Sequence, residues 1–428
     1  MTTLIIITFI IGYLFIALES ITKVNKAAVA LLLCVVCWGL YAIGGYAEEG
    51  MLNHTIESNL GEASTTLFFL MGAMTIVEIV DEYGGFNFVR NVLHSRTKRG
   101  LMWKIGFMTM ILSAVLDNLT TSIVMIMILR KLVSERSERI WFASLIIIAA
   151  NAGGAFSPIG DVTTIMLWNG KMITAAGVIK EIFIPSLLAF VIPATVVQFR
   201  LKGQLKEVAK DSTKVVSDIT HFQRNLVFAI GVGGLCLVPV FHAVTGEPAF
   251  VGILLVLAVL WVATELMYWR KDEHDPMSRR VTQMLSHIDM STILFFLGIL
   301  MAVAVLSEIG VLTSLGKWFE TNIGNNYLVT GAIGILSSIV DNVPLVAGAM
   351  KMYVIDPAGG ALGVDGMFWQ LLAYCAGTGG SLLIIGSAAG VVVMGLERIT
   401  FGWYMRHITP IALLGYIAGI VSYWLMNL

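Results

Sequence analysis

Two Asp-Asn pairs are the residues of this sequence best suited to chemistry, because both lie inside long apolar segments. Asp117-Asn118 stands within the segment 101–133, and Asp341-Asn342 stands within 326–354. A carboxylate at membrane depth costs several kcal/mol unless a positive group meets it. No lysine or arginine lies near the middle of any predicted span, which leaves a bound cation or a proton as that group. The alternative role is structural, since aspartate and asparagine also suit helix N-caps.

A third polar group lies in the segment 140–168, where residues 151–164 read NAGGAFSPIGDVTT. Three glycines and a proline break a helix, and a membrane protein tolerates such a break where the backbone is buried or lines a cavity. The opened backbone frees carbonyl oxygens, and hard cations such as Na⁺ prefer oxygen ligands. The side chains expected to complete an all-oxygen site are Asn151, Ser157, Asp161, Thr163 and Thr164. A kinked packing helix is the alternative.

The segment 368–394 repeats the glycines of 140–168 but not their charge. Ser387 stands where Asp161 stands in the first segment. The two predicted half-sites are therefore unequal. The first is strongly anionic, and the second contributes Asp341 and hydroxyl groups.

The candidate side chains fall into two sets. The residues expected to bind the cation and the proton are Asp117, Asn118, Thr120, Thr121, Asn151, Ser157, Asp161, Thr163, Thr164, Ser337, Asp341, Asn342 and Ser381. Within this set a sodium ion is expected at Asp117, Asn151 and Asp161. Carboxylates near the ends of two other spans are candidates for a proton path, with an interfacial position as the alternative: Glu78, Asp81 and Glu308.

The composition predicts an integral membrane protein that positions these residues within a bilayer. Hydrophobic residues make up 57% of the 428-residue chain, and only 13% of its residues are charged. Soluble domains carry about 25% charged residues. The mean hydropathy of +0.85 excludes a cytosolic enzyme, a secreted domain and a disordered chain. No basic stripe supports nucleic-acid binding, and zinc-protease, phosphate-loop and serine-hydrolase motifs are missing, so we expect neither an enzyme nor a resident cofactor.

The apolar runs predict an all-α membrane protein with about ten crossings and two re-entrant hairpins. Single spans are expected at about 3–19, 27–46, 66–83, 182–199, 225–243, 249–268, 291–309 and 408–427. The glycine-interrupted segments 140–168 and 368–394 are expected to be broken helices. The segments 101–133 and 326–354 are too long for one crossing and carry a charge at their centres, so we expect helical hairpins there.

Basic residues predict the orientation of these spans. Of the 27 lysine and arginine residues, the predicted loops place all but four on one side: Lys171, Lys180, Lys317 and Lys351. The side with the other 23 is expected to be cytoplasmic. Both termini would then lie outside the cell (inner) membrane, and the two hairpins would enter from opposite sides.

Features of the first half recur in the second in one register. Phe68 recurs as Phe295 at an offset of 227, and Asp117 as Asp341 at an offset of 224. An odd number of crossings in each half would place the second half upside down relative to the first. Inverted repeats with broken helices at matching positions are typical of secondary transporters. The expected division is a first repeat at 1–199, a cytoplasmic linker at 200–224 and a second repeat at 225–428.

The motifs at 116–121 (LDNLTT), 151–164 and 341–344 (DNVP) resemble those of the NhaD-type sodium/proton antiporters, within the ion transporter superfamily. The resemblance extends from about residue 67 to residue 390. It implies exchange of Na⁺ or Li⁺ for H⁺ and a homodimer with a scaffold and a moving transport domain. The positions matching the family's polar residues are Asp117, Asn118, Thr120, Asn151, Asp161, Thr163, Thr164, Ser337 and Asn342.

These inferences converge on one hypothesis with one main alternative. The buried acids would bind either Na⁺ or protons, and the hairpins and broken helices would carry the site past a scaffold, as in an elevator. The alternative is a sodium-coupled carrier of a dicarboxylate or oxyanion on the same scaffold. Such carriers favour neutral residues at the hairpin tips, whereas this sequence places three acids in the site. A membrane enzyme or receptor is a more distant alternative.

Overall fold

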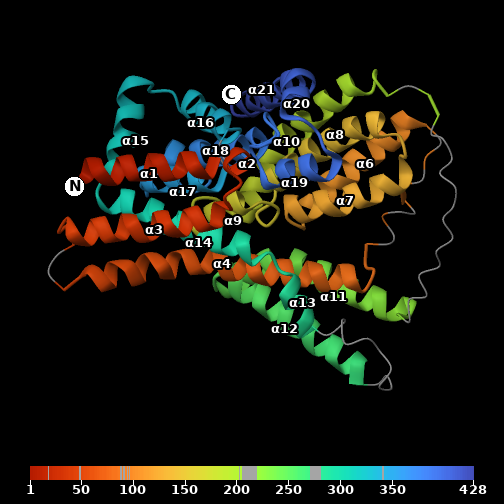
Figure 1. The fold of residues 1–428 in the computed structure, drawn as a ribbon, viewed down its shortest axis with the longest axis horizontal. Coiled ribbons are helices and arrows are strands. Elements are labelled where there is room, and N and C mark those ends of the chain that lie inside the picture. Colours follow the sequence, from red (N-terminus) through yellow and green to blue (C-terminus); the bar gives the residue numbers. More distant parts are fainter. Residues whose placement is uncertain are drawn as a thin grey trace.

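The computed structural model describes residues 1–428 except 18, 48–49, 87–88, 90–91, 94, 96, 202, 205–218, 270–280 and 340–341. Within these described ranges the regular secondary structure is helical (Figure 1). The helices of the first half are α1 (Thr2–Ala17), α2 (Glu19–Thr22), α3 (Lys26–Ile43), α4 (Leu52–Glu82), α6 (Lys98–Ser113), α7 (Asn118–Leu132), α8 (Arg136–Ala155), α9 (Val162–Asn169) and α10 (Ala175–Val197). Those of the second half are α11 (His221–Thr245), α12 (Ala249–Trp269), α13 (Val281–Met284), α14 (Met290–Glu308), α15 (Val311–Asn322), α16 (Asn326–Ser337), α17 (Asn342–Met352), α18 (Met367–Gly379), α19 (Ala388–Glu397), α20 (Phe401–His407) and α21 (Thr409–Met426).

The all-α membrane architecture predicted from the sequence is confirmed. In the described part of the chain, 7 helices are long and apolar enough to cross a membrane: α3, α4, α10, α11, α12, α14 and α21. The shorter apolar helix α1 and the interrupted pairs α8/α9 and α18/α19 bring the possible crossings to the expected ten. Helices α6/α7 and α16/α17 form the two hairpins, whose second helices begin at Asn118 and Asn342.

Three features of the helices differ from the sequence prediction. Helix α4 begins at Leu52 rather than near residue 66, because a hydropathy profile detects only its apolar part. Its polar first turns are helical because their side chains bind other helices, as Asn59 binds Glu308 and Glu62 binds Lys351. Helices α15 and α20 are additional. They are short and carry polar residues, so no spanning pattern marks them.

The helices pack in two groups (Figure 1). We call the first the α4 group, formed by α1, α3, α4, α11, α12 and α14, and the second the hairpin group, formed by α6–α10, α16–α19 and α21. The two groups meet where α17 packs on α14 and α9 packs on α4. Side chains at this boundary are mostly apolar. The broken helices and both hairpins thus lie in one group, beside the long helices of the other.

Both hairpins bind the neighbouring broken helix in the same way. In the first half, Ser113 Oγ at the end of α6 donates to the carbonyl of Ala150 in α8, at 2.6 Å. In the second half, Ser337 Oγ at the end of α16 donates to the carbonyl of Ala376 in α18, at 2.9 Å. Ser337 follows Ser113 by 224 residues, and Ala376 follows Ala150 by 226 residues. These offsets match the register of the predicted repeat.

Two glycines bring the same elements into backbone contact. A Cβ atom at Gly153 would lie 2.3 Å from the carbonyl oxygen of Met110, and one at Gly379 would lie 2.1 Å from that of Gly334. Side chains do not reach such distances without moving the backbone. Glycine is therefore required at both crossings, which hold each hairpin against its broken helix.

We expect Gly153→Ala to destabilise the protein by about 1–3 kcal/mol, because the added methyl group must push α6 and α8 apart. The control is Gly61→Ala in α4, where an added Cβ would have no atom within 4 Å. Thermal unfolding of the purified protein in detergent measures the difference. Equal melting temperatures for the two variants would contradict this account.

A buried ion cluster joins the first hairpin to the second broken helix. Glu397, at the end of α19, is 2% exposed and receives Arg130 Nε and Arg139 Nε, each at 2.7 Å. Arg136 adds hydrogen bonds to the carbonyls of Glu397 and Arg398, at 3.2 and 2.7 Å. Cations at the C-terminal end of a helix also interact favourably with its dipole. The cluster therefore fastens α7 and α8 to α19.

Replacing Glu397 by Gln should lower the stability by about 3–5 kcal/mol, because two guanidinium groups lose their buried counter-charge. Glu320→Gln in α15 is the control, since this side chain is exposed. Chemical or thermal unfolding in detergent gives the comparison. A loss no larger than that of the control would show that the cluster is not holding these helices together.

Candidate functional site

Three polar side chains cap the helices that begin at the breaks and at the first hairpin turn. Asp117 accepts a hydrogen bond from the backbone N–H of Thr120 at 2.8 Å, and Asp161 accepts one from that of Thr163 at 3.0 Å. Ser387 accepts one from the backbone N–H of Gly390, at 3.2 Å. The positive end of each helix dipole stabilises negative charge at such positions. The Asp117 and Asp161 carboxylates therefore lie at the N-terminal ends of α7 and α9.

Asn118 connects the first hairpin turn to the first broken helix. Its Nδ2 atom donates to Asp161 Oδ2 at 2.9 Å and to Asn151 Oδ1 at 3.1 Å. Asp161 is 2% exposed, and Asn151 is fully buried. The amide of Asn118 thus holds two buried oxygen atoms, one from each side of the break between α8 and α9.

Asn151 extends this network into the second broken helix. Its Nδ2 atom donates to Ser381 Oγ at 2.9 Å and to Ser387 Oγ at 3.0 Å. Both serines lie in the break between α18 and α19. The breaks of the two halves therefore share one hydrogen-bonded network, although more than 200 residues separate them in sequence.

The second hairpin reaches the same carboxylate. Asn342 Nδ2 lies 3.5 Å from Asp161 Oδ2, and the hydroxyl of Thr163 lies 3.1 Å from Asp161 Oδ1. Amide and hydroxyl groups from three elements thus surround the Asp161 carboxylate. The other predicted acid of this hairpin, Asp341, lies outside the described residues.

Other predicted site residues make separate contacts. The carboxylate of Asp117 binds both the hydroxyl of Thr120, at 2.5 Å, and its backbone N–H, at 2.8 Å, within its own helix. Ser157 donates to the carbonyl of Ala114, and Ser337 to that of Ala376. The Thr164 hydroxyl donates to the backbone oxygen of Asp161 at 2.8 Å. Within the described part of the chain, the buried hydroxyl of Thr121 has no hydrogen-bond partner.

The three candidates for a proton path do not lie together. Glu78 and Asp81 are near the C-terminal end of α4, whereas Glu308 accepts from Asn59 Nδ2 at 2.9 Å near the beginning of that helix. Asn59 and Asp81 are about 33 Å apart along the axis of α4 at 1.5 Å per residue. The register of the predicted repeat aligns Asp81 with Glu308, and an inverted repeat places such partners toward opposite membrane faces.

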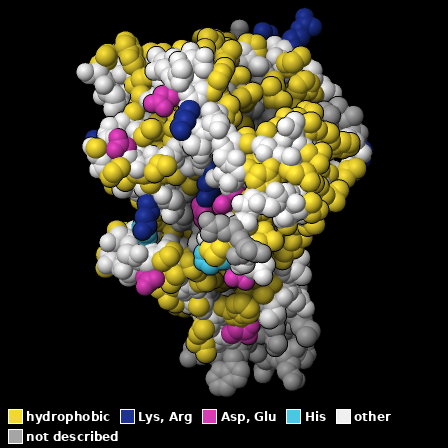
Figure 2. All heavy atoms as spheres, turned by 90° about the vertical axis from the view of Figure 1, so that its left-hand side faces the viewer, with side chains coloured by type: hydrophobic (Ala, Val, Ile, Leu, Met, Phe, Trp, Pro, Cys, Tyr) yellow, Lys and Arg dark blue, Asp and Glu magenta, His cyan; other side chains and the backbone are white. Residues whose placement is uncertain are grey.

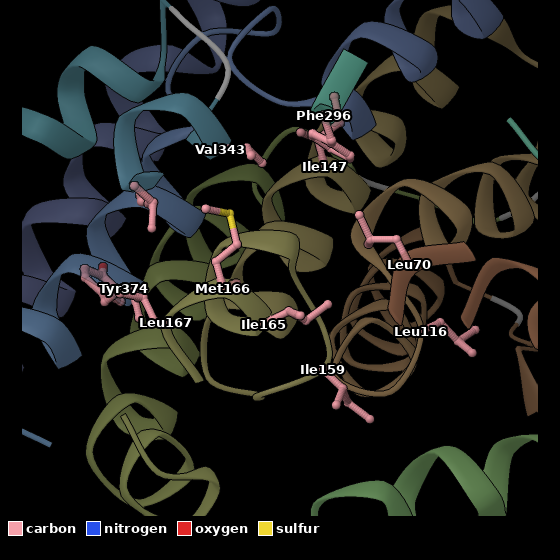
Figure 3. Close-up of a cluster of buried hydrophobic side chains, with 14 of the residues drawn as sticks. Leu70, Leu116, Ile147, Ile159, Ile165, Met166, Leu167, Phe296, Val343 and Tyr374 are labelled. Atoms are coloured by element: carbon pink, nitrogen blue, oxygen red, sulfur yellow. The ribbon is translucent and has the colours of Figure 1, made fainter. Parts of the chain in front are cut away.

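A cluster of buried apolar side chains joins the two helix groups (Figure 3). The labelled cluster brings Leu70 of α4 and Phe296 of α14 together with residues of the hairpin group, among them Leu116, Ile159 and Val343. Leu116 directly precedes Asp117, and Val343 directly follows Asn342. Water is therefore excluded from much of the surroundings of Asp161, which strengthens every electrostatic interaction of its carboxylate.

Ser387 is not among the binding residues predicted from the sequence, where it is the neutral counterpart of Asp161. In the structure it belongs to the network through Asn151. Its signal is the repeat register, which places it 226 residues after Asp161. Among the described residues, no three histidine, cysteine, aspartate or glutamate side chains gather as metal ligands. The oxygen donors assembled here are one carboxylate, amides and hydroxyls. This donor set fits a monovalent hard cation better than a transition metal.

The chain belongs to a family of membrane transporters. A family profile described as "Citrate transporter" matches residues 13–371, and the NhaD-type character seen in the motifs is confirmed by similar proteins. The chain is 43% identical over 96% of its length to "Sodium/proton antiporter 1" of Arabidopsis thaliana, covering 70% of that protein. It is 30% identical to "Na(+)/H(+) antiporter NhaD" of Vibrio cholerae, over 99% of this chain and 91% of that one. Transporters of this kind are not enzymes.

A solved structure shares the fold. The crystal structure of the Alcanivorax borkumensis YdaH transporter, described as having an unusual topology, matches with a TM-score of 0.61 at 12% sequence identity. The match covers 94% of this chain and 98% of that one. At this identity the likeness concerns the fold alone.

Asn118→Leu should destabilise the protein by about 1–3 kcal/mol, because Asp161 Oδ2 and Asn151 Oδ1 both lose a buried donor. Asn322→Leu is the matched control, since Asn322 is exposed and donates only locally, to Trp318. Thermal unfolding in detergent measures both changes. An Asn118→Leu variant as stable as the control would remove Asn118 from the network.

Proposed function

We propose that this protein is a secondary active transporter that exchanges Na⁺ or Li⁺ for H⁺, with Asp161 at the centre of its binding site. The observation that carries the proposal is the buried Asp161 carboxylate among uncharged amide and hydroxyl groups. The sequence places no lysine or arginine within the broken segment 151–164 itself. The names of the similar proteins from Arabidopsis thaliana and Vibrio cholerae, which are sodium/proton antiporters, support the same exchange.

Competition for one carboxylate explains exchange. Burial favours a protonated carboxyl group, whereas a nearby cation favours the carboxylate. Asn118 and Asn342 direct amide nitrogens at Asp161 Oδ2, and rotation of each amide would present an oxygen instead. Two amide oxygens and the carboxylate would then coordinate Na⁺. Protonation of Asp161 would release the ion.

Asn151 and the other acids have secondary roles in this proposal. Asp117 and Asn151 would complete the sodium site with Asp161, and Asp117 or Asp341 would take a second proton or charge. Glu78 and Asp81 would supply protons at one end of α4. Glu308 would do so at the other end of that helix. Binding of Na⁺ by Asp117 would require the hairpin to move, because the Asp117 carboxylate is bound to its own helix in this conformation.

Alternating access would follow from the two helix groups. The hairpin group would move as one body past the α4 group, as in an elevator, with a homodimer providing a fixed scaffold. The matched contacts at Ser113 and Ser337 support inverted repeats at 1–199 and 225–428, joined by the linker 200–224. The distribution of basic residues supports a location in the cell (inner) membrane with both termini outside.

A sodium-coupled dicarboxylate or oxyanion carrier is the second candidate. The description of the matching family profile as a citrate transporter favours it. A buried carboxylate at the junction of both hairpins opposes it, because an anionic substrate would meet a like charge there. Sodium-driven uptake of labelled citrate into proteoliposomes, without proton movement, would select this alternative.

Asp161→Asn should abolish exchange, because the amide can neither release a proton nor balance the charge of a cation. Proteoliposomes containing a pH-sensitive dye should lose the dequenching that Na⁺ or Li⁺ causes with the unchanged protein. Asp289→Asn is the matched control. Asp289 caps α14 through Thr292, as Asp161 caps α9 through Thr163, but Asp289 is exposed. Normal exchange by the Asp161 variant would remove Asp161 from the mechanism.

A further inference from the structure

A cavity lies between the two helix groups at the end of the molecule where α4 begins. Its walls are α4 and α14 on one side and the ends of α9 and α17 on the other. The volume of about 90 Å³ has room for several water molecules. One wall atom, the buried amide nitrogen of Asn169, has no hydrogen-bond partner among the described residues. A buried amide donor of this kind is normally paired, so this wall suits a hydrated cavity.

The cavity and the candidate site lie at opposite ends of the same two short helices. Helix α9 begins at the Asp161 cap and contributes Met166 and Asn169 to the cavity. Helix α17 begins at Asn342 and contributes Ala347 and Lys351. The five residues from Asn342 to Ala347 rise about 7–8 Å along a helix. Only about a turn and a half of helix therefore separates the polar network from the cavity floor.

An ion pair bridges the cavity from one helix group to the other. Lys351 Nζ, at the end of α17, lies 2.6 Å from Glu62 Oε2 in α4. The side chains are 31% and 59% exposed, respectively. Figure 2 shows the end of the molecule at the left of Figure 1, where basic and acidic side chains meet near the middle of the face. Because the partners belong to different groups, sliding of one group past the other must break this pair.

We propose that this cavity is the entrance for the transported monovalent cation at one membrane face, with Glu62 as the first carboxylate that the cation meets and Lys351 as its tethered competitor. This inference rests on the proposed cation exchange. In this conformation the ammonium group of Lys351 is paired with the Glu62 carboxylate and links the two helix groups. Na⁺ or Li⁺ takes its place once the hairpin group moves.

The charges around the pair agree with this role. Glu308 lies on the same side of α4 and holds Asn59, another wall residue, at 2.9 Å. Glu62 and Glu308 bring two negative charges to the entrance, against one positive charge from Lys351. An acidic entrance raises the local concentration of cations. Since Glu62 and Lys351 are partly exposed, their pairing should change the apparent affinity by up to about fivefold.

The test measures the half-saturating Na⁺ concentration for exchange from each membrane face of proteoliposomes containing the full chain. Lys351→Met should lower this concentration two- to about fivefold at the cavity face, because Glu62 is freed. Glu62→Gln should raise it by a similar factor, and the double variant should match Glu62→Gln. Lys180→Met is the matched control, since Lys180 is exposed, pairs with Glu181 and does not line the cavity.

Values equal to those of the control at the cavity face would overturn the proposal, and so would equal changes at both faces. A second measurement tests the bridging itself. In a Glu62→Cys/Lys351→Cys variant, a short bis-methanethiosulfonate reagent should stop exchange, and dithiothreitol should restore it. Single-cysteine variants control for reaction at the native cysteines. Undiminished exchange after cross-linking would show that the groups need not separate here.

The outcomes separate this inference from the proposed function. If the unchanged protein shows no cation-dependent proton movement, the exchange itself is wrong. If the unchanged protein exchanges Na⁺ for H⁺ and the Glu62 and Lys351 variants behave like the control, only the entrance is wrong.

Discussion

The structure depends on one electrostatic constraint, which is the presence of a carboxylate inside an apolar helical protein. Asp161 meets this constraint at the interior end of α9, where a helix N-terminus and the amides of Asn118 and Asn342 stabilise its charge. The breaks and hairpin turns exist at this depth because continuous helices would leave no backbone N–H groups for such an acid. Glycines in α8 and α18 let the hairpins approach the broken helices to backbone contact.

The network around Asp161 also binds elements of the hairpin group to one another. Asn151 joins the breaks of the two halves through hydrogen bonds to Ser381 and Ser387. At the C-terminal end of α19, Glu397 joins the same halves through ion pairs with Arg130 and Arg139. The hairpin group is therefore held at two depths by polar contacts. Its boundary with the α4 group is mostly apolar, with directional contacts such as the Glu62–Lys351 pair at the rim. Hydrophobic attraction across such a boundary is non-directional, whereas directional hydrogen bonds and ion pairs hold the hairpin group together internally.

The two halves repeat their backbone contacts but not their charges. Ser387 caps α19 as Asp161 caps α9, and both side chains reach the network around Asn151. A second carboxylate at position 387 would place two like charges in one buried site, where repulsion would force one of them to bind a proton. Serine supplies the oxygen without the charge. Among the described residues of this network, Asp161 therefore supplies the one carboxylate, and its counterpart Ser387 supplies a hydroxyl.

The sequence by itself determined the helical membrane class, the two hairpins, the two broken helices and the polar residues at their turns. Apolar length, glycine, proline and unmatched charge are local properties, and they constrain local structure directly. Only the tertiary structure decided which of those residues meet. It joined Asn118, Asn151, Asp161 and Ser387, left Asp117 with its own helix, and placed Asp81 and Glu308 at opposite ends of long helices. It also revealed the polar beginning of α4, where Asn59 binds Glu308 of α14 and Glu62 binds Lys351 of α17. Such contacts depend on how distant helices pack, and no local pattern in the sequence encodes that distance.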